Sequence, residues 1–125
     1  MPHQVFVYGT LKRGHSRASL LCGQRLLGPA WSAPRYRLFS LGSWPALVEA
    51  ERPDVEGPGV SVYGEVWSVD AACLARLDWE EDVDEGLYER RSIELLAWDV
   101  QRYGPAEAYF YCGKVRGLGD CGTCW

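Results

Sequence analysis

The alternation of apolar and polar residues predicts a chain built mainly from short strands. Residues 4–8 (QVFVY) are β-branched and aromatic, and Gly9 follows them directly, so we expect a first strand that ends in a tight loop. The same signals predict further strands over residues 35–41, 60–69, 91–99 and 106–111. With the apolar run at 46–48, the pattern gives about six strands.

One helix is predicted between these strands. Asp70 is a favourable N-cap residue, and residues 71–76 are good helix formers. Leu74 and Leu77 recur on one face of that helix, which should therefore pack against the strands. Residues 16–27 carry a weaker pattern that suits either a helix or an extended segment. Because strands come first and are accompanied by only one or two helices, we expect an α+β fold or a small barrel-like fold.

The length and composition are those of one globular domain. The chain has 125 residues, of which 47% are hydrophobic and 24% charged, and domains are commonly about 100–150 residues long. We assign residues 1–112 to this domain. Residues 113–125 are rich in glycine and cysteine, and we expect them to form a mobile C-terminal tail.

The charge balance narrows the classes of partner. Seventeen acidic and thirteen basic residues give a net charge of −4, whereas proteins that bind nucleic acid usually carry a basic excess. No apolar run approaches the ~18 residues of a membrane span. Strand-like sequence begins within the first residues, so we expect no signal peptide and a cytoplasmic location. We therefore expect no nucleic-acid partner and no membrane partner, and the pattern does not indicate an oligomeric state.

The five cysteines do not form a recognisable disulfide or metal pattern. Cys22, Cys73 and Cys112 stand apart among apolar residues, and we expect them to be small buried hydrophobic residues. Cys121 and Cys124 have the C-x-x-C spacing of redox and zinc sites, but the segment around them lacks the strand–helix unit and the regularly spaced further ligands of such sites. A solvated tail is the favoured interpretation, with a redox or metal role as the alternative.

An acidic run over residues 78–85 holds six carboxylates. It lacks the alternating ligands and the following Glu of an EF-hand calcium loop, so we expect five of the six to be solvated. Glu81 is the exception, because on a continued helix Leu74, Leu77 and Glu81 lie within about 60° of arc. Its carboxylate is predicted to point inward, where desolvation and acidic neighbours would raise its pKa. Such a group suits general acid–base catalysis near neutral pH.

Several segments in the same order resemble the gamma-glutamylcyclotransferase-like family. Residues 5–14 (VFVYGTLKRG) resemble the opening of that family, a strand followed by Tyr-Gly-x-Leu. Further resemblances are found at 44–48 (WPALV), 62–67 (VYGEVW), 77–81 (LDWEE), 88–90 (YER) and the aromatic final strand at 106–111. Each segment is a weak signal alone, but their common order covers most of residues 4–112.

The resemblance implies an enzyme that releases 5-oxoproline from a γ-glutamyl compound, with that small molecule as its partner and with no metal or cofactor. The implied fold is α+β, a small mixed β-barrel with flanking helices. The short length and the Gly-Thr-Leu sequence are most similar to the γ-glutamylamine branch. By position, Glu81 would transfer protons, and the glutamyl head would be held by Tyr8, Gly9, Thr10 and Leu11. Tyr109 is a further substrate-binding candidate, with a core position as the alternative.

The chain also departs from the family pattern. Arg17 and Ala18 stand where family members often carry Asn-His, and the stretch between Glu81 and Tyr88 is one residue longer than in the family pattern. Two other classes of function are therefore kept: a non-catalytic module that binds a small metabolite, and a protein that binds a basic partner through residues 80–85. A module that only binds has no reason to bury an acid at Glu81, so we favour the enzyme.

Overall fold

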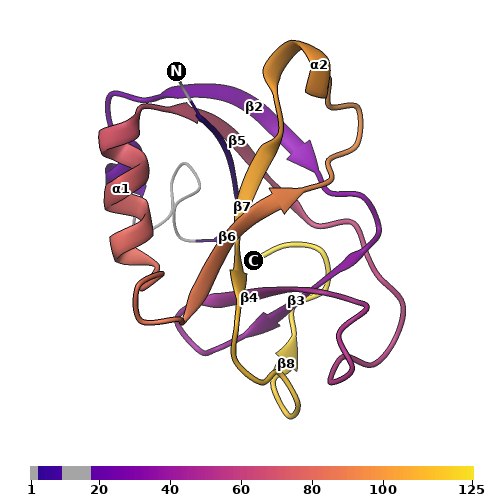
Figure 1. Cartoon of the computed structure of the whole chain (residues 1–125). Helices are drawn as coiled ribbons and strands as arrows, with labels where there is room; N and C mark the ends of the chain where they lie inside the picture. The colour runs from indigo at the N-terminus through magenta and orange to yellow at the C-terminus, as the bar shows by residue number, and fades with distance from the viewer. Residues whose placement is uncertain (1–2, 10–17) are drawn as a thin grey trace.

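The computed structural model describes residues 3–9 and 18–125, which form two β-sheets and two α-helices (Figure 1). A short 3-10 helix, Ala18–Leu21, precedes the second strand. The helices are α1 (Ala71–Glu80) and α2 (Val100–Tyr103). The strands are β1 (His3–Val7), β2 (Arg25–Trp31), β3 (Tyr36–Ser40), β4 (Pro45–Glu49), β5 (Tyr63–Val69), β6 (Tyr88–Ile93), β7 (Ala106–Tyr111) and β8 (Gly119–Asp120).

The larger sheet has the strand order β2-β5-β1-β7-β6, and the smaller sheet has the order β4-β3-β8. In the larger sheet β1 lies in the centre, antiparallel to β5 and parallel to β7. The predicted α+β class is confirmed. The described strands do not close into a barrel, however, because β2 and β6 form the two edges of the larger sheet and neither pairs with a strand of the smaller one.

Strand β1 is covered on both faces, because its side chains alternate between two clusters. Phe6 packs with Leu38 and Leu47 of the smaller sheet. Val5 and Val7 point to the opposite face and pack with α1, whose Leu77 lies in the same cluster. The central strand therefore holds α1 and the smaller sheet on opposite sides of the larger sheet.

Helix α1 begins where the sequence predicts. The Asp70 carboxylate accepts a hydrogen bond of 2.7 Å from the Cys73 N–H group, which otherwise has no partner within the helix. Leu74 and Leu77 are buried against the sheet. The helix ends at Glu80, and Glu81 is its C-cap residue.

The structure differs from the sequence prediction at several elements. Strand β2 has no clear alternation because its register shifts at a bulge between Leu26 and Gly28, where Gly28 has a φ of 142°. As an edge strand it also tolerates Pro29. Strand β6 begins at Tyr88, before the predicted range 91–99, and ends within that range at Ile93, while the short helix α2 follows the range.

The C-terminal segment packs against the smaller sheet. Val115 is buried in a cluster with Phe39 and Val48. Strand β8 pairs with β3, and the Tyr63 N–H donates to the Thr123 carbonyl. Residues 113–125 therefore complete the smaller sheet, a long-range pairing for which glycine content gives no signal.

The expected burial of the isolated cysteines holds for only one of them. Cys73 lies on the buried face of α1, whereas Cys22 and Cys112 are exposed.

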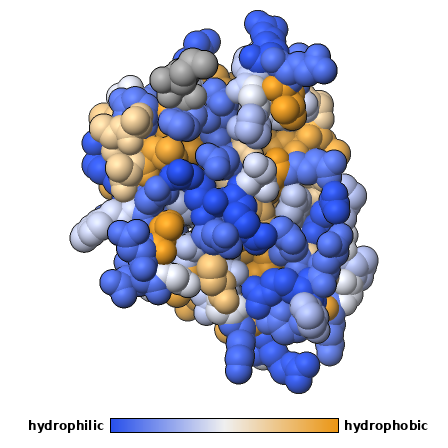
Figure 2. Space-filling view, viewed as in Figure 1, coloured by the Kyte–Doolittle hydropathy of each residue, from blue (hydrophilic) through white to orange (hydrophobic). Residues whose placement is uncertain are grey.

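The face of the molecule in Figure 2 is mainly hydrophilic, with small separate hydrophobic areas. Within residues 3–9 and 18–125, no helix is long and apolar enough to cross a bilayer.

Candidate active site

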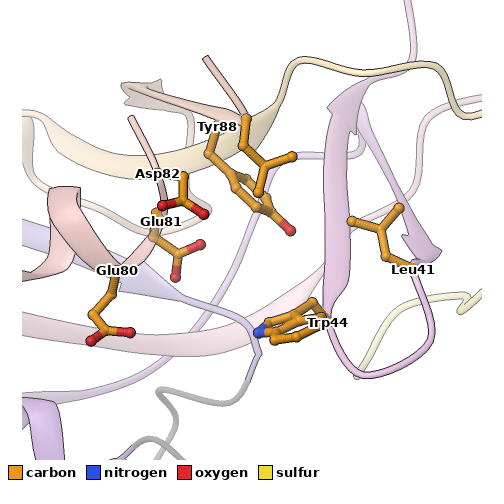
Figure 3. Close-up of a pocket in the computed structure, with 7 residues that line it drawn as sticks. Leu41, Trp44, Glu80, Glu81, Asp82 and Tyr88 are labelled. Carbon is orange, nitrogen blue, oxygen red and sulfur yellow. The ribbon is translucent and has the colours of Figure 1, made fainter. Parts of the chain in front are cut away.

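A pocket of about 210 Å³ lies at the C-terminal end of α1, between the helix, the β3–β4 hairpin and the start of β6 (Figure 3). Three of its lining residues are acidic and the others are apolar or aromatic. They are Leu41, Trp44, Glu80, Glu81, Asp82, Leu87 and Tyr88. The pocket combines a short carboxylate cluster with a largely hydrophobic opposite wall.

Glu81 is the buried acid of this pocket. Glu81 is only 8% exposed. Leaving tyrosines aside, Glu81 and Ser32 are the buried polar residues in the part of the chain that the structure describes. The Glu81 N–H donates to the Leu77 carbonyl at 2.9 Å, which continues the helical turn, and Asp82 then turns the chain with a φ of 51°. The Glu81 carboxylate points into the pocket, whereas Glu80 points away from it (Figure 3). The inward direction expected from the apolar stripe is therefore observed, one residue beyond the helix.

Tyr88 and Trp44 form the wall opposite Glu81 (Figure 3). The Tyr88 hydroxyl donates a 2.6 Å hydrogen bond to the carbonyl of Pro45, which fixes β6 against the start of β4. Trp44 precedes Pro45 and is about half exposed, so its ring is available to a ligand in the pocket. Neither residue is predicted from its side-chain chemistry. The signal that could identify them is their position in segments 44–48 and 88–90, which resemble the family pattern.

Gly9 reaches the same wall from the end of β1. The residue is buried, and a β-carbon built on it would lie 2.6 Å from Cγ of Pro45. The chain can pass this close to Pro45 only because Gly9 has no side chain. Thr10 and Leu11, the other two residues predicted from the Tyr-Gly-x-Leu motif, lie outside the described residues. The described part of the motif is thus one residue from Trp44 and the pocket.

Tyr8 and Tyr109 are packed inside the fold. The Tyr8 hydroxyl donates to the Tyr109 carbonyl, and its ring stacks with Phe6 at a centroid distance of 6.4 Å. The Tyr109 hydroxyl donates to Oδ1 of Asp78 at 2.7 Å. Burial, and then the Asp78 carboxylate, raises the pKa of Tyr109 well above its ordinary value. Tyr109 does not line the pocket around Glu81, so its contact with substrate stays a prediction.

The expectation that five carboxylates of the acidic run are solvated is wrong for Asp78. It is half-buried, binds Tyr109 through Oδ1 and forms an ion pair with Arg90 of β6 through Oδ2. Sequence reasoning missed this role because the partners lie twelve and thirty-one positions further along the chain. Elsewhere in the described ranges, no group of three or more His, Cys, Asp or Glu side chains is placed to hold a metal ion.

Comparison with known proteins identifies the family. A family model described as Gamma-glutamyl cyclotransferase, AIG2-like, matches residues 5–121. A Vibrio cholerae protein is 41% identical over 111 residues, which cover 89% of this chain and 84% of that protein. The Bos taurus gamma-glutamylaminecyclotransferase is 33% identical over 113 residues, covering 86% of this chain and 63% of that protein.

An Escherichia coli relative links the sequence match to the fold. The gamma-glutamylcyclotransferase family protein YtfP is 35% identical over 115 residues, covering 92% of this chain and 88% of that protein. Its solution structure superimposes with a TM-score of 0.65 at 34% identity, over 96% of this chain and 92% of that one. The chain therefore belongs to the gamma-glutamyl cyclotransferase, AIG2-like family, and the prediction that it is an enzyme of this type is confirmed.

Proposed function

We propose that this chain releases 5-oxoproline and a free amine or amino acid from a γ-glutamyl compound, with Glu81 as the general acid and base. The observation that carries the proposal is the Glu81 carboxylate, which is buried and points into a pocket formed partly by segments of the family pattern. The match to the family supports the reaction class. The role of Glu81 and the mechanism below are our inference.

The reaction is an intramolecular transfer of the γ-glutamyl acyl group. The α-amine nitrogen of the substrate attacks its own γ-carbonyl carbon and closes a five-membered ring, and the bond from that carbon to the leaving nitrogen then breaks. One proton must leave the attacking nitrogen, and one must reach the departing nitrogen. Holding the substrate in the conformation for attack supplies ~7–11 kcal/mol of such a barrier. The remaining chemistry needs one group that takes and returns a proton.

Glu81 suits that task because it is a carboxylate that faces the pocket and can carry one proton. Leu41, Leu87 and Tyr88 contribute apolar surface to the same pocket, and carboxylates are among the side chains that act as general acids and bases. After it accepts the proton of the attacking nitrogen, the same carboxylic acid can donate it to the leaving nitrogen. A second catalytic side chain is not required by this scheme.

The two ends of the pocket suggest how the substrate lies. We place the glutamyl head toward the end of β1, where Tyr8, Gly9, Thr10 and Leu11 remain the predicted binding residues and Tyr109 a further candidate. Gly9 lets the backbone come close to the ligand. The leaving group would lie against Trp44, whose half-exposed ring suits the hydrocarbon part of an amine. This orientation agrees with the γ-glutamylamine branch predicted from the sequence, to which the Bos taurus relative belongs by name.

The test is 5-oxoproline release from a panel of γ-glutamyl compounds: γ-glutamyl amino acids, γ-glutamyl-ε-lysine, simple γ-glutamylamines and glutathione. Wild type, Glu81→Gln and Glu85→Gln are compared. Glu85 is exposed and belongs to the same acidic run without lining the pocket. We expect Glu81→Gln to lose about 10²–10⁴-fold in turnover while it still binds the best substrate, and Glu85→Gln to match wild type.

Two results would contradict the proposal in different ways. Full turnover by Glu81→Gln would show that another group transfers the protons. A folded wild type that releases 5-oxoproline from none of the compounds, yet binds one of them by calorimetry, would indicate the non-catalytic binding module instead.

A further inference from the structure

We propose that Asp78 is a positioning residue, which fixes the last turn of α1 so that the Glu81 carboxylate faces the end of β1. The inference rests on the proposed function, because it assigns Glu81 the chemical step. It concerns a hydrogen-bonded cluster of Asp78, Tyr109 and Arg90, which lies outside the residues that line the pocket.

Tyr109 connects two parts of the site through two different atoms. Its hydroxyl donates to Oδ1 of Asp78 on α1 at 2.7 Å, and its backbone carbonyl accepts from the hydroxyl of Tyr8 at the end of β1. Strand β7, which carries Tyr109, lies directly beside β1 in the larger sheet. A single buried residue thus sets the distance between the helix that carries Glu81 and the strand end that carries the Tyr-Gly motif.

The second oxygen of Asp78 is also held. Oδ2 forms an ion pair with Arg90 of β6, and Nε of Arg90 lies 3.5 Å from Oε1 of Glu107 on β7. The Asp78 carboxylate therefore bridges two adjacent strands, β7 through Tyr109 and β6 through Arg90. Two contacts with a rigid sheet restrict rotation of the helix about its axis more strongly than one contact would.

Rotation of α1 about its axis would change the direction of the Glu81 side chain. Glu81 follows Asp78 by three residues, which is close to one helical turn of 3.6 residues, and its N–H still donates to the Leu77 carbonyl. A change in the orientation of Asp78 is therefore passed on to the Glu81 side chain. A displacement of about 1 Å at a reacting group can cost roughly 10²-fold in rate.

The environment keeps these bonds in place at neutral pH. Tyr109 is only 3% exposed, and burial, followed by the Asp78 carboxylate, raises the pKa of its hydroxyl. The hydroxyl therefore stays protonated and remains a donor. Half-burial of Asp78 and Arg90 shields their ion pair from solvent more than that of the exposed pair Arg35–Glu51.

The experiment tests whether Asp78 orients Glu81 for the reaction or only holds α1 on the sheet. Tyr109→Phe removes only the hydroxyl, Asp78→Ala removes both contacts, and Asp78→Asn keeps an oxygen that accepts from Tyr109. Glu107→Gln is the matched control, because it weakens the outer partner of Arg90 without touching the Asp78–Tyr109 bond. Each variant is assayed for kcat and KM on the γ-glutamyl compound that wild type turns over best. Amide hydrogen exchange of the folded variants is measured in parallel.

We expect Asp78→Ala to lower kcat about tenfold or more, with KM within roughly twofold of wild type, because substrate binding is kept and alignment is lost. Tyr109→Phe should lower kcat by a similar factor. Asp78→Asn should recover part of the loss, and Glu107→Gln should retain the wild-type kcat. The Glu81 N–H should exchange at least about fivefold faster in Tyr109→Phe, with the Leu74 N–H in the first turns of α1 unchanged.

The proposal is overturned if Tyr109→Phe keeps both the wild-type kcat and the wild-type exchange at Glu81. It is also overturned if Glu107→Gln loses as much turnover as Asp78→Ala. Should Asp78→Ala not fold, Tyr109→Phe decides alone, because it deletes one atom. If wild type is inactive on every compound, the proposed function has failed, and the exchange measurement still shows whether Asp78 and Tyr109 order the turn at Glu81.

Discussion

A β-carbon on Gly9 would lie 2.6 Å from Cγ and 3.0 Å from Cδ of Pro45. Real β-carbons do not approach other atoms this closely, and the proline ring has little freedom to move aside. The carbonyl of Pro45 in turn accepts from Tyr88 in the wall of the pocket. The glycine of the Tyr-Gly motif is therefore required by packing at this position, independently of any contact with substrate.

The contact predicts the effect of Gly9→Ala. We expect the variant to lower the free energy of unfolding by about 1–3 kcal/mol, because the new methyl group overpacks the wall formed by Pro45. In the double variant Gly9→Ala/Pro45→Ala, only the β-carbon at 4.0 Å remains near the added methyl group, so most of the loss attributable to Gly9→Ala should be recovered. Urea denaturation of the two single variants and the double variant measures the coupling.

A glycine with open space beside it provides the control. Gly119 has no atom within 4 Å of a built β-carbon and no positive φ, so Gly119→Ala should change the free energy of unfolding little. Additive losses in the Gly9→Ala/Pro45→Ala pair would show that the contact with Pro45 is not the cause.

The two exposed tryptophans near Glu81 predict different effects on substrate affinity. Trp44 is 49% exposed and lines the pocket, whereas Trp79 on α1 is 76% exposed and does not line it. If the leaving group packs on Trp44, Trp44→Ala should raise KM for a hydrophobic γ-glutamylamine about tenfold, or roughly 1.4 kcal/mol of binding. Trp79→Ala should leave KM unchanged. Equal KM values for the two variants would contradict the proposed orientation of the leaving group.

Asp70 predicts a loss of stability in acid. The N–H of Cys73, followed by the side chain of Gln24, holds the pKa of Asp70 below its ordinary value of 3.8. A folded-state pKa below the unfolded one means that the ionised carboxylate adds stability above pH 3.8, and that this contribution is lost as the pH falls through the folded value. The difference in Tm between wild type and Asp70→Ala should therefore be constant near neutral pH and shrink below the ordinary pKa.

Asp70→Asn separates the charge from the hydrogen bond, because it keeps an oxygen for the Cys73 N–H and does not titrate. Its Tm should fall less with acid than that of wild type over the same range. A constant difference between wild type and Asp70→Ala at all values of pH would show that ionisation of Asp70 does not contribute.

Local sequence patterns predicted those elements whose hydrogen bonds join nearby residues or whose side chains are buried at regular intervals. Strand β7 was predicted with the bounds that the structure has, and Asp70 caps α1 as expected. The inward side chain of Glu81 also followed from helical spacing. These features depend on residues within a few positions of one another, or on a periodicity that one buried face imposes.

Features that depend on distant partners could not be predicted in this way. The spacing of the acidic run does not distinguish Asp78 from its neighbours, because its partner Tyr109 is brought beside it only when β7 enters the sheet. Strand β2 is hidden by its bulge at Gly28. In the C-terminal segment, one buried residue, Val115, carries the packing among glycines that suggested a tail.

Val115 predicts whether the C-terminal segment unfolds with the rest of the chain. It is 2% exposed and packs with Phe39 and Val48 of the smaller sheet, and its N–H donates to Asp54 at 3.3 Å. Arg52 binds Asp54 and the carbonyl of Tyr111, so this segment is held at several points. Val115→Ala should therefore lower the free energy of unfolding by roughly 1–3 kcal/mol, in a single transition with an unchanged dependence on urea.

The exposed neighbour Lys114 gives the matched control for Val115→Ala. Lys114→Ala removes an exposed side chain at the same point of the segment and no buried contact is lost. The free energy of unfolding of this variant should therefore stay within about 0.5 kcal/mol of wild type. A loss confined to Val115→Ala means that residues 113–125 belong to the cooperative unit, since only a buried contact with the smaller sheet distinguishes the two positions. Equal stability of the two variants would instead place the boundary of the domain at residue 112, where composition alone suggested it.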